Sequence, residues 1–150
     1  MDDFDLRILR VLQEEPVLSV ADLGERVGLS HTPCWRRVKR MEEEGIIRGR
    51  ALVLNEEALN LSVTVLASIK LRAHDEAALE EFEAAVNACP WIVSCFSLSG
   101  EYDYQLRIVV ASIAAYERLM KKVIVHLPHF GTLYSSFVLK RVKLTNRLPI

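Results

Sequence analysis

The sequence predicts an α+β protein with an N-terminal winged helix-turn-helix and a C-terminal ferredoxin-like βαββαβ domain. Two observations predict this fold. Apolar residues first recur with the 3.6-residue period of helices, and from residue 61 they alternate with the period of 2 that is typical of strands. Capping residues, glycines and prolines then divide both parts into elements of ordinary length. We expect domains at residues 1–54 and 61–150, joined by a polar connector at residues 55–60.

Two short helices are predicted at the N-terminus. The first covers residues 2–14, which carry an amphipathic apolar stripe, and Pro16 ends it. The second begins after Ser19, whose hydroxyl can cap a helix, and it ends at Gly28, which suits the left-handed conformation. Gly24 inside this helix is unexpected, because glycine costs about 1 kcal/mol relative to alanine in a helix.

A third helix is predicted from Ser30, a good N-cap residue, to Gly45. Pro33 lies in its first turn, where a missing N–H group is harmless. The segment IIRGRALVL, residues 46–54 with Gly49 at its middle, is predicted to form a β-hairpin, the wing of the motif. The buried stripe of the third helix is predicted to consist of Cys34, Val38 and Met41.

The second half of the chain follows the order β-α-β-β-α-β. Each helix starts at a capping residue, and Pro90 and Pro128 end the two helices. The elements are a strand over residues 61–71, a helix after Asp75, a hairpin over residues 91–110 that turns at Gly100 and Glu101, a helix after Ser112 and a strand over residues 133–144.

Composition predicts a cytoplasmic protein. No stretch of the 150 residues approaches the roughly 20 apolar residues that a membrane-spanning helix needs. The N-terminus MDDFDLRILR is acidic and has a helical pattern, so it does not resemble a secretory signal. Three cysteines without CxxC spacing indicate free thiols in a reducing compartment.

Positive charge is concentrated on the third predicted helix and the segment after it. The chain has a net charge of −1, but residues 30–50 hold six basic and three acidic residues, so their net charge is +3. This pattern favours a recognition helix that lies in the DNA major groove, although a solvated charged helix face is the simpler alternative. The candidate DNA-binding residues are Ser30, His31, Thr32, Pro33, Arg36, Arg37, Lys39 and Arg40.

The residue types of this helix suit double-stranded DNA. Arginine can pair with guanine through two hydrogen bonds, while hydroxyl groups and the helix N-terminus can donate to phosphate. We expect Arg36 and Arg37 to project away from the buried stripe and to contribute most to binding. The glutamates that follow are predicted partners at i,i+4 spacing, Glu43 for Lys39 and Glu44 for Arg40.

Trp35 has two interpretations. The side chain can contact a DNA sugar or a thymine methyl group, or it can pack inside the N-terminal domain. Because tryptophan is rarely left exposed, we expect it to pack against the first helix or the wing.

Four segments resemble the Lrp/AsnC family of bacterial and archaeal transcription regulators, and together they span nearly the whole chain. The opening segment carries Asp5 and Leu6 of the pattern DxxDLRIL. VADLGERVGLSHTPCWRRVKRMEEEGII is similar to the family's helix-turn-helix, which commonly runs LAxxVGLSxTPCxxRVxxLExxGxI. GEYDYQL at residues 100–106 resembles the GxYDYLL of the family's ligand-responsive domain, and VKLTNRLPI resembles its usual ending.

The resemblance implies properties that periodicity does not show. Members of this family form homodimers through the sheets of the α+β domain, often assemble into octamers and bind DNA as oligomers. Many respond to an amino acid or a related small molecule held where two dimers meet. The family's effector positions correspond here to Gly100, Tyr102, Asp103, Tyr104, Thr132, Ser135 and Ser136.

The proposed effector chemistry is that of a free amino acid. Asp103 can accept from an α-amino group, while backbone N–H and hydroxyl groups can donate to an α-carboxylate. A structural aspartate in a hairpin is the alternative interpretation of Asp103. Gln105 stands where the family usually has leucine, and the sequence HFG replaces the usual Gly-Val at residues 129–131. Both departures leave the identity of the effector open.

The sequence favours a protein that is not an enzyme and that needs no metal or cofactor. No glycine-rich phosphate loop, nucleophile elbow or catalytic triad is present. His126 and His129 have HxxH spacing, but Pro128 interrupts the helix between them, so a polar loop is favoured. Two alternative functions stay open: a tetrapyrrole (sirohaem-type) decarboxylase of similar architecture, and a chromatin-organising protein that binds DNA without an effector.

Overall fold

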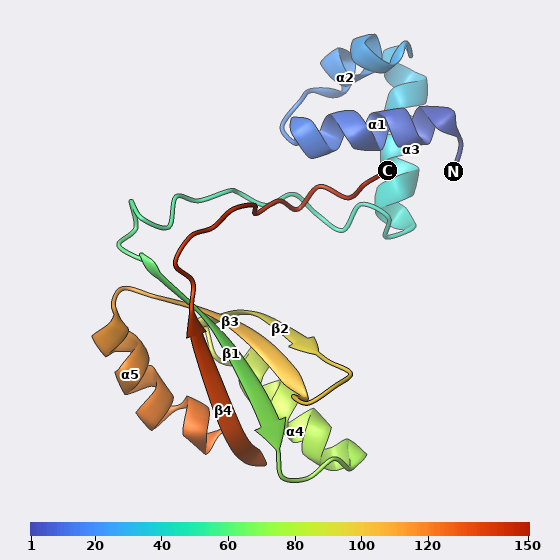
Figure 1. Cartoon of the computed structure of the whole chain (residues 1–150). Coiled ribbons are helices and arrows are strands. Elements are labelled where there is room, and N and C mark those ends of the chain that lie inside the picture. The colour runs from blue at the N-terminus through green and yellow to red at the C-terminus, as the bar shows by residue number, and fades with distance from the viewer. The chain divides into compact units, whose positions relative to one another are not determined.

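The computed structural model describes all residues, Met1–Ile150, in two compact units (Figure 1). One unit contains residues Met1–Val53 together with Val142–Ile150, and the other contains Leu54–Arg141. This division differs from the predicted boundaries at both ends of the second domain. The C-terminal tail packs with the N-terminal helices, and the expected connector at residues 55–60 packs with the sheet.

The N-terminal unit forms the three predicted helices, α1 (Asp3–Glu14), α2 (Val20–Val27) and α3 (His31–Glu43). Ser19 caps α2 by accepting from the N–H of Asp22, and Gly28 ends it with a φ of 75°. The helices enclose one small apolar core of Ile8, Leu12, Leu23, Val27, Cys34, Val38 and Met41. The predicted buried stripe of α3 is therefore confirmed.

Gly24 has a packing role that its helix propensity conceals. A Cβ atom at this position would lie 2.6 Å from the carbonyl oxygen of Leu29. The N–H of Leu29 in turn donates to the carbonyl oxygen of Gly24 at 2.8 Å. The turn between α2 and α3 thus folds directly over Gly24, where a side chain has no room.

The predicted β-hairpin of the wing is not formed. Residues 46–54 contain no strand, and the segment is tied to α3 by the N–H of Ile47, which donates to the carbonyl oxygen of Met41 at 3.0 Å. Together with α1 and the C-terminal tail it lines a cavity of about 610 Å³. The amide of Gln13 on α1 donates to the carbonyl oxygen of Leu148 at 3.3 Å and accepts from the N–H of that residue. The C-terminal tail was not expected in the N-terminal domain, but it lies next to the segment that was predicted to form the wing.

The C-terminal unit has the predicted ferredoxin-like order of elements: β1 (Val63–Leu71), α4 (Glu76–Asn87), β2 (Ile92–Ser97), β3 (Tyr104–Val110), α5 (Ile113–Lys122) and β4 (Phe130–Phe137). Its four antiparallel strands lie in the order β2-β3-β1-β4. A short 3₁₀ helix, Ile124–His126, follows α5, so the single helix expected up to Leu127 is interrupted. The last strand was predicted over residues 133–144 but begins and ends earlier.

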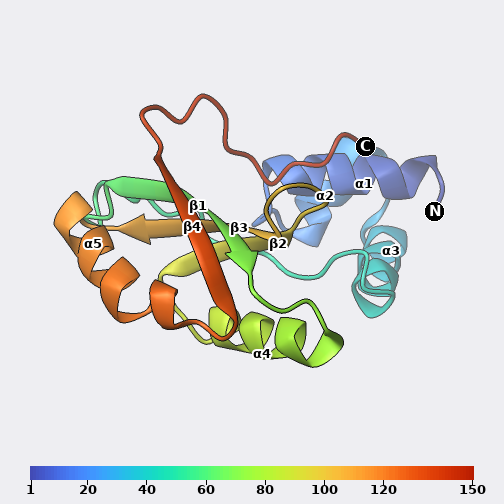
Figure 2. The same ribbon diagram turned by 60° about the horizontal axis from the view of Figure 1, so that its bottom comes forward.

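The two helices α4 and α5 cover the same face of the sheet, as Figure 2 shows. Val65, Ala67, Ile69 and Leu71 of β1 point to this face and are buried. The alternate residues belong to the opposite face, which neither α4 nor α5 covers. This open face of the sheet carries the half-exposed side chains of Leu66, Phe96 and Tyr134.

Local contacts fix the ends of the C-terminal elements. Asp75 caps α4 and Ser112 caps α5, as predicted. Glu56 in the expected connector pairs with Arg107 of β3 at 2.7 Å and with Arg141 after β4. This carboxylate therefore joins residues 55–60 to the sheet.

No helix of the chain has the length and apolar character needed to span a membrane.

Candidate nucleic-acid interface and effector site

The first turn of α3 is presented to solvent. Ser30 is the N-cap residue, but its hydroxyl makes no capping hydrogen bond, and it is exposed together with His31, Thr32 and Pro33. The first N–H groups of a helix carry a partial positive charge and lack partners within the helix. This turn therefore offers N–H and hydroxyl donors suited to an anionic partner.

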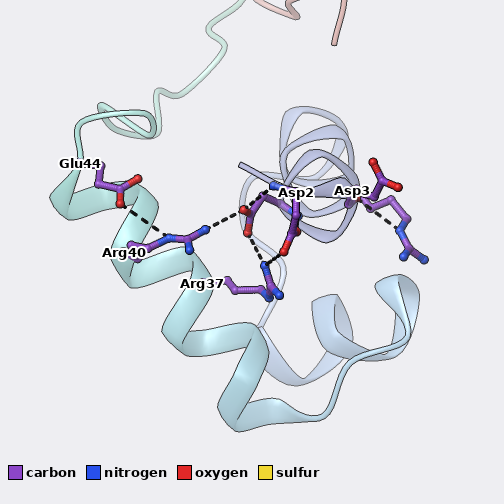
Figure 3. A network of polar contacts seen from close by, with 7 residues as sticks. Asp2, Asp3, Arg37, Arg40 and Glu44 are labelled. Atoms are coloured by element: carbon purple, nitrogen blue, oxygen red, sulfur yellow. Dashed lines mark hydrogen bonds and ion pairs between the residues drawn. The ribbon is translucent and has the colours of Figure 1, made fainter.

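Arg37 and Arg40 both reach the start of α1 (Figure 3), where Arg37 is partly buried and Arg40 stays exposed. Arg37 Nη1 lies 2.7 Å from Asp2 Oδ2 and 2.8 Å from Asp5 Oδ1. Arg40 Nη2 lies 2.6 Å from Asp5 Oδ2. Arg37 thus lies off the buried stripe of α3, as expected, but the carboxylates of Asp2 and Asp5 already hold its guanidinium group.

Asp5 is the centre of this network and is only 1% exposed. Burial alone would raise the pKa of its carboxyl group, but hydrogen bonds from the N–H of Asp2 and from Arg37 and Arg40 outweigh burial, and the pKa is lowered. Asp2 and Asp5 also form a capping box at the start of α1. We call these four residues, Asp2, Asp5, Arg37 and Arg40, the anchor cluster, and it fixes α3 against the start of α1.

Arg36 remains available to a partner. It is exposed and takes part in none of the ion pairs of α3. Lys39 Nζ lies 3.8 Å from Glu43 Oε1, and Arg40 Nε lies 3.8 Å from Glu44 Oε1, as the i,i+4 spacing predicted. Such pairs between exposed side chains contribute little to stability and can be exchanged for a phosphate.

Trp35 lies on the surface of α3 and is 44% exposed. The expectation that it packs inside the N-terminal unit is therefore wrong. Lys39 Nζ lies 5.1 Å from the centre of the indole ring, within the range of a cation–π interaction. A large aromatic side chain thus stands beside the exposed basic residues.

The predicted effector residues lie on β3, β4 and the turn before β3, but they do not share one face of the sheet. Tyr104 is only 2% exposed, and its hydroxyl donates to Glu83 Oε1 of α4 at 2.7 Å. Ser135 Oγ lies 2.5 Å from the hydroxyl of Tyr116 on α5. Both residues thus belong to the side of the sheet covered by helices, unlike the other effector candidates.

The other effector candidates lie in the turn or on the open face. Gly100 is exposed in the turn between β2 and β3. The ring of Tyr102 lies 6.4 Å from that of Tyr134, whose neighbours Thr132 and Ser136 are exposed by the alternation of β4. These residues form a polar and aromatic group at the uncovered side of the sheet.

Asp103 already has partners within the chain. Its Oδ2 accepts from the N–H of Leu71 at 2.7 Å and lies 3.0 Å from His74 Nε2. The N–H of Asp103 also donates to the carbonyl oxygen of Ile69 at 2.9 Å. Burial would raise the pKa of this carboxyl group, but the Leu71 N–H and His74 lower it. Asp103 therefore joins the start of β3 to the end of β1, which is the structural role considered as the alternative.

Family models match both parts of the chain. The model described as Lrp/AsnC ligand binding domain matches residues 64–148, and the model described as winged helix-turn-helix DNA-binding matches residues 1–48. The chain belongs to the Lrp/AsnC family. This Lrp/AsnC protein is 39% identical over 150 residues to the Bkd operon transcriptional regulator of Pseudomonas aeruginosa, covering 100% of this chain and 98% of that protein. It is 34% identical over 150 residues to the DNA-binding transcriptional activator DecR of Escherichia coli, covering 100% and 99%.

Solved structures agree with this assignment. An AsnC family transcriptional regulator from Agrobacterium tumefaciens matches with a TM-score of 0.94 at 43% identity, over 99% of this chain and 97% of that one. A transcriptional regulator from Neisseria meningitidis in complex with L-Met matches with a TM-score of 0.94 at 38% identity, over 99% and 96%. The α+β fold with an N-terminal helix-turn-helix and a C-terminal ferredoxin-like domain is thereby confirmed.

The DNA-binding residues predicted from the sequence did not include Asp2 and Asp5 of the anchor cluster. Asp5 precedes the buried residues Ile8 and Leu12 by three and seven positions, so it occupies the buried stripe of α1. A carboxylate at such a position needs a charged partner, and this was the available signal. His74 and Tyr134, which contact Asp103 and Tyr102, carry no comparable signal.

The chain offers no cluster for metal chemistry. No group of three or more His, Cys, Asp or Glu side chains is arranged to hold a metal ion, and the three cysteines are free thiols. His129 Nε2 lies 2.8 Å from Glu81 Oε2, and this loop contact accounts for one histidine of the HxxH spacing.

Replacement of Asp103 by alanine in this Lrp/AsnC protein should lower the free energy of unfolding by about 1–3 kcal/mol, because the N–H of Leu71 loses a charged acceptor. Asp103→Asn keeps an acceptor oxygen and should lose less. His74→Ala removes only an exposed partner and serves as the matched control. Urea denaturation measures all three variants, and wild-type stability of Asp103→Ala would contradict the structural role of this residue.

Proposed function

We propose that this Lrp/AsnC protein regulates transcription by placing the exposed side of α3 in the major groove of double-stranded DNA. One observation carries the proposal. The anchor cluster holds α3 against α1, while the first turn of α3, Arg36 and Lys39 stay exposed. A helix that is held in place and carries exposed basic residues fits groove recognition. The relatives' activity as regulators supports it.

Individual side chains of this surface have distinct roles in the proposal. Arg36 contacts a guanine edge or a phosphate, and Lys39 contacts a phosphate. Ser30 and Thr32 donate to the phosphate that faces the helix N-terminus. His31 and Pro33 complete the first turn, while Arg37 and Arg40 act through the position of α3.

We propose further that an amino acid or a similar small molecule controls DNA binding. The Neisseria meningitidis relative in complex with L-Met supports this chemistry. The uncovered side of the sheet offers Tyr102, Thr132 and Ser136, and the turn at Gly100 offers backbone N–H groups. In this proposal Asp103 holds the hairpin in place. Tyr104 and Ser135 contact the helices on the covered side of the sheet and so support the site from below.

The open face of the sheet is the proposed dimer surface, and dimers are proposed to assemble further, up to octamers. Its half-exposed Leu66, Phe96 and Tyr134 are covered by neither α4 nor α5. Leu66→Glu should therefore reduce the mass of the full chain measured by light scattering. Val17→Glu, at an exposed apolar residue of the N-terminal unit, is the matched control. Unchanged mass of Leu66→Glu at every concentration would contradict this surface.

DNA titration tests the regulatory function against its alternatives. The full chain is used to select duplexes from a random pool, and the affinity for the selected and for unrelated duplexes is measured at several salt concentrations. A specific regulator should prefer the selected duplex by about 10³-fold or more, with a clear loss of affinity at high salt. Equal affinity for all duplexes would favour the chromatin-organising alternative. Absence of DNA binding together with tetrapyrrole turnover would favour the decarboxylase.

Thermal melting with each of the twenty amino acids tests the effector. A ligand that binds only the native state must raise the melting temperature. A cytoplasmic location, where both DNA and free amino acids are accessible, completes the proposal.

A further inference from the structure

Trp35 is an apolar side chain on the surface of α3 that the core of its unit does not use. It belongs to neither the buried residues of that core nor the partly buried residues packed against it. At 44% exposure, much of the indole ring is open to solvent. Tryptophan is enriched at interfaces, because it combines a large apolar ring with an N–H donor.

The position of Trp35 on α3 places it beside the exposed basic residues. Successive helix residues are rotated by about 100°, so Trp35 lies between the buried Cys34 and the outward Arg36. Lys39, one turn later, covers part of the ring at 5.1 Å. Arg37 and Arg40 belong to the opposite flank, where the anchor cluster holds them. The indole ring therefore lies beside the exposed basic residues Arg36 and Lys39.

We propose that Trp35 is a specificity-determining residue that contacts the C5-methyl group of a thymine in the major groove. This proposal rests on the proposed DNA-binding function and deepens it. The thymine methyl is the one apolar group among the base edges of the major groove, and an indole ring matches it. Lys39 holds the ring and lies close enough to the same surface to neutralise an adjacent phosphate.

Thymine-to-uracil replacement in the selected duplex tests the contact, because this change removes only the methyl group. Each thymine is replaced in turn, and affinities are measured for the full chain and its variants. For the wild type, one replacement should weaken binding by about fourfold, the value of one buried methyl-sized group. Trp35→Ala should bind the thymine duplex more weakly and lose the difference between thymine and uracil at that position.

Two further variants separate the contact from other effects. Trp35→Phe keeps an apolar ring and should retain part of the thymine preference, which also covers the case in which the alanine variant folds poorly. Arg36→Ala should weaken binding to both duplexes while it keeps the preference. A Trp35→Ala protein with the wild-type thymine preference would overturn the proposal and leave the DNA-binding function intact. A wild type that binds all sequences equally would refute the proposed function itself.

Discussion

Asp5→Ala is expected to lower the free energy of unfolding by about 2–4 kcal/mol. The alanine removes the buried acceptor of Arg37 and Arg40 and one half of the capping box at the start of α1. Arg37 keeps Asp2 as a partner, and Arg40 can reach water, which limits the loss. Urea denaturation followed by circular dichroism measures the change.

The contribution of Asp5 should also depend on pH. Its folded-state pKa is lowered below the usual value of 3.8, so its stabilisation is fully present above that value. The stabilisation is lost as the pH falls through the lower folded-state pKa. The stability difference between wild type and Asp5→Ala should therefore shrink in acid. Asp3→Ala, in the same turn but exposed, is the matched control. An Asp5→Ala protein with wild-type stability at neutral pH would contradict the role of the anchor cluster.

Gly24→Val is expected to cost about 2–3 kcal/mol, although valine has the higher helix propensity. Its Cβ would lie 2.6 Å from the carbonyl oxygen of Leu29, so the turn between α2 and α3 must move. That movement displaces the start of α3 and should also weaken DNA binding. Ala21→Val, at an exposed position of the same helix, changes propensity without a clash and should have a small effect. Equal stability of the two variants would show that the turn tolerates a side chain.

Periodicity and capping residues were enough to predict most elements of this chain. Ser19, Gly28, Asp75 and Ser112 mark helix ends in the structure as they do in the sequence. These signals act within a few residues, and local chemistry decides them. The prediction of a wing over residues 46–54 failed, because this segment lines a cavity with the C-terminal tail, a partner far away in the sequence.

The roles of the arginines on α3 could not be predicted from local sequence patterns. Helical spacing places Arg37 off the buried stripe, but it does not reveal that Asp2 and Asp5, more than 30 positions earlier in the chain, hold its guanidinium group. The long-range partner changes the expected role from DNA contact to positioning. Only the packing of α1 on α3 contains this information.

Ser135 and Ser136, two of the predicted effector residues, are neighbours on strand β4. Neighbouring positions of a strand point to opposite faces, so Ser135 and Ser136 cannot both face one ligand. The resemblance to the family implies both residues, whereas the period of 2 places them on opposite faces of β4. In the structure Ser135 contacts Tyr116 below the sheet, while Ser136 is exposed.

The central claim is that exposed Arg36 contacts DNA while Arg37 positions α3, and one comparison of two alanine variants tests it most directly. Affinity for the selected duplex and melting temperature are measured for both variants at one salt concentration. Arg36→Ala should melt like the wild type and bind DNA more weakly by about 1–3 kcal/mol, and Arg37→Ala should melt at a lower temperature. Wild-type affinity of Arg36→Ala, combined with lost binding and wild-type melting of Arg37→Ala, would contradict the claim.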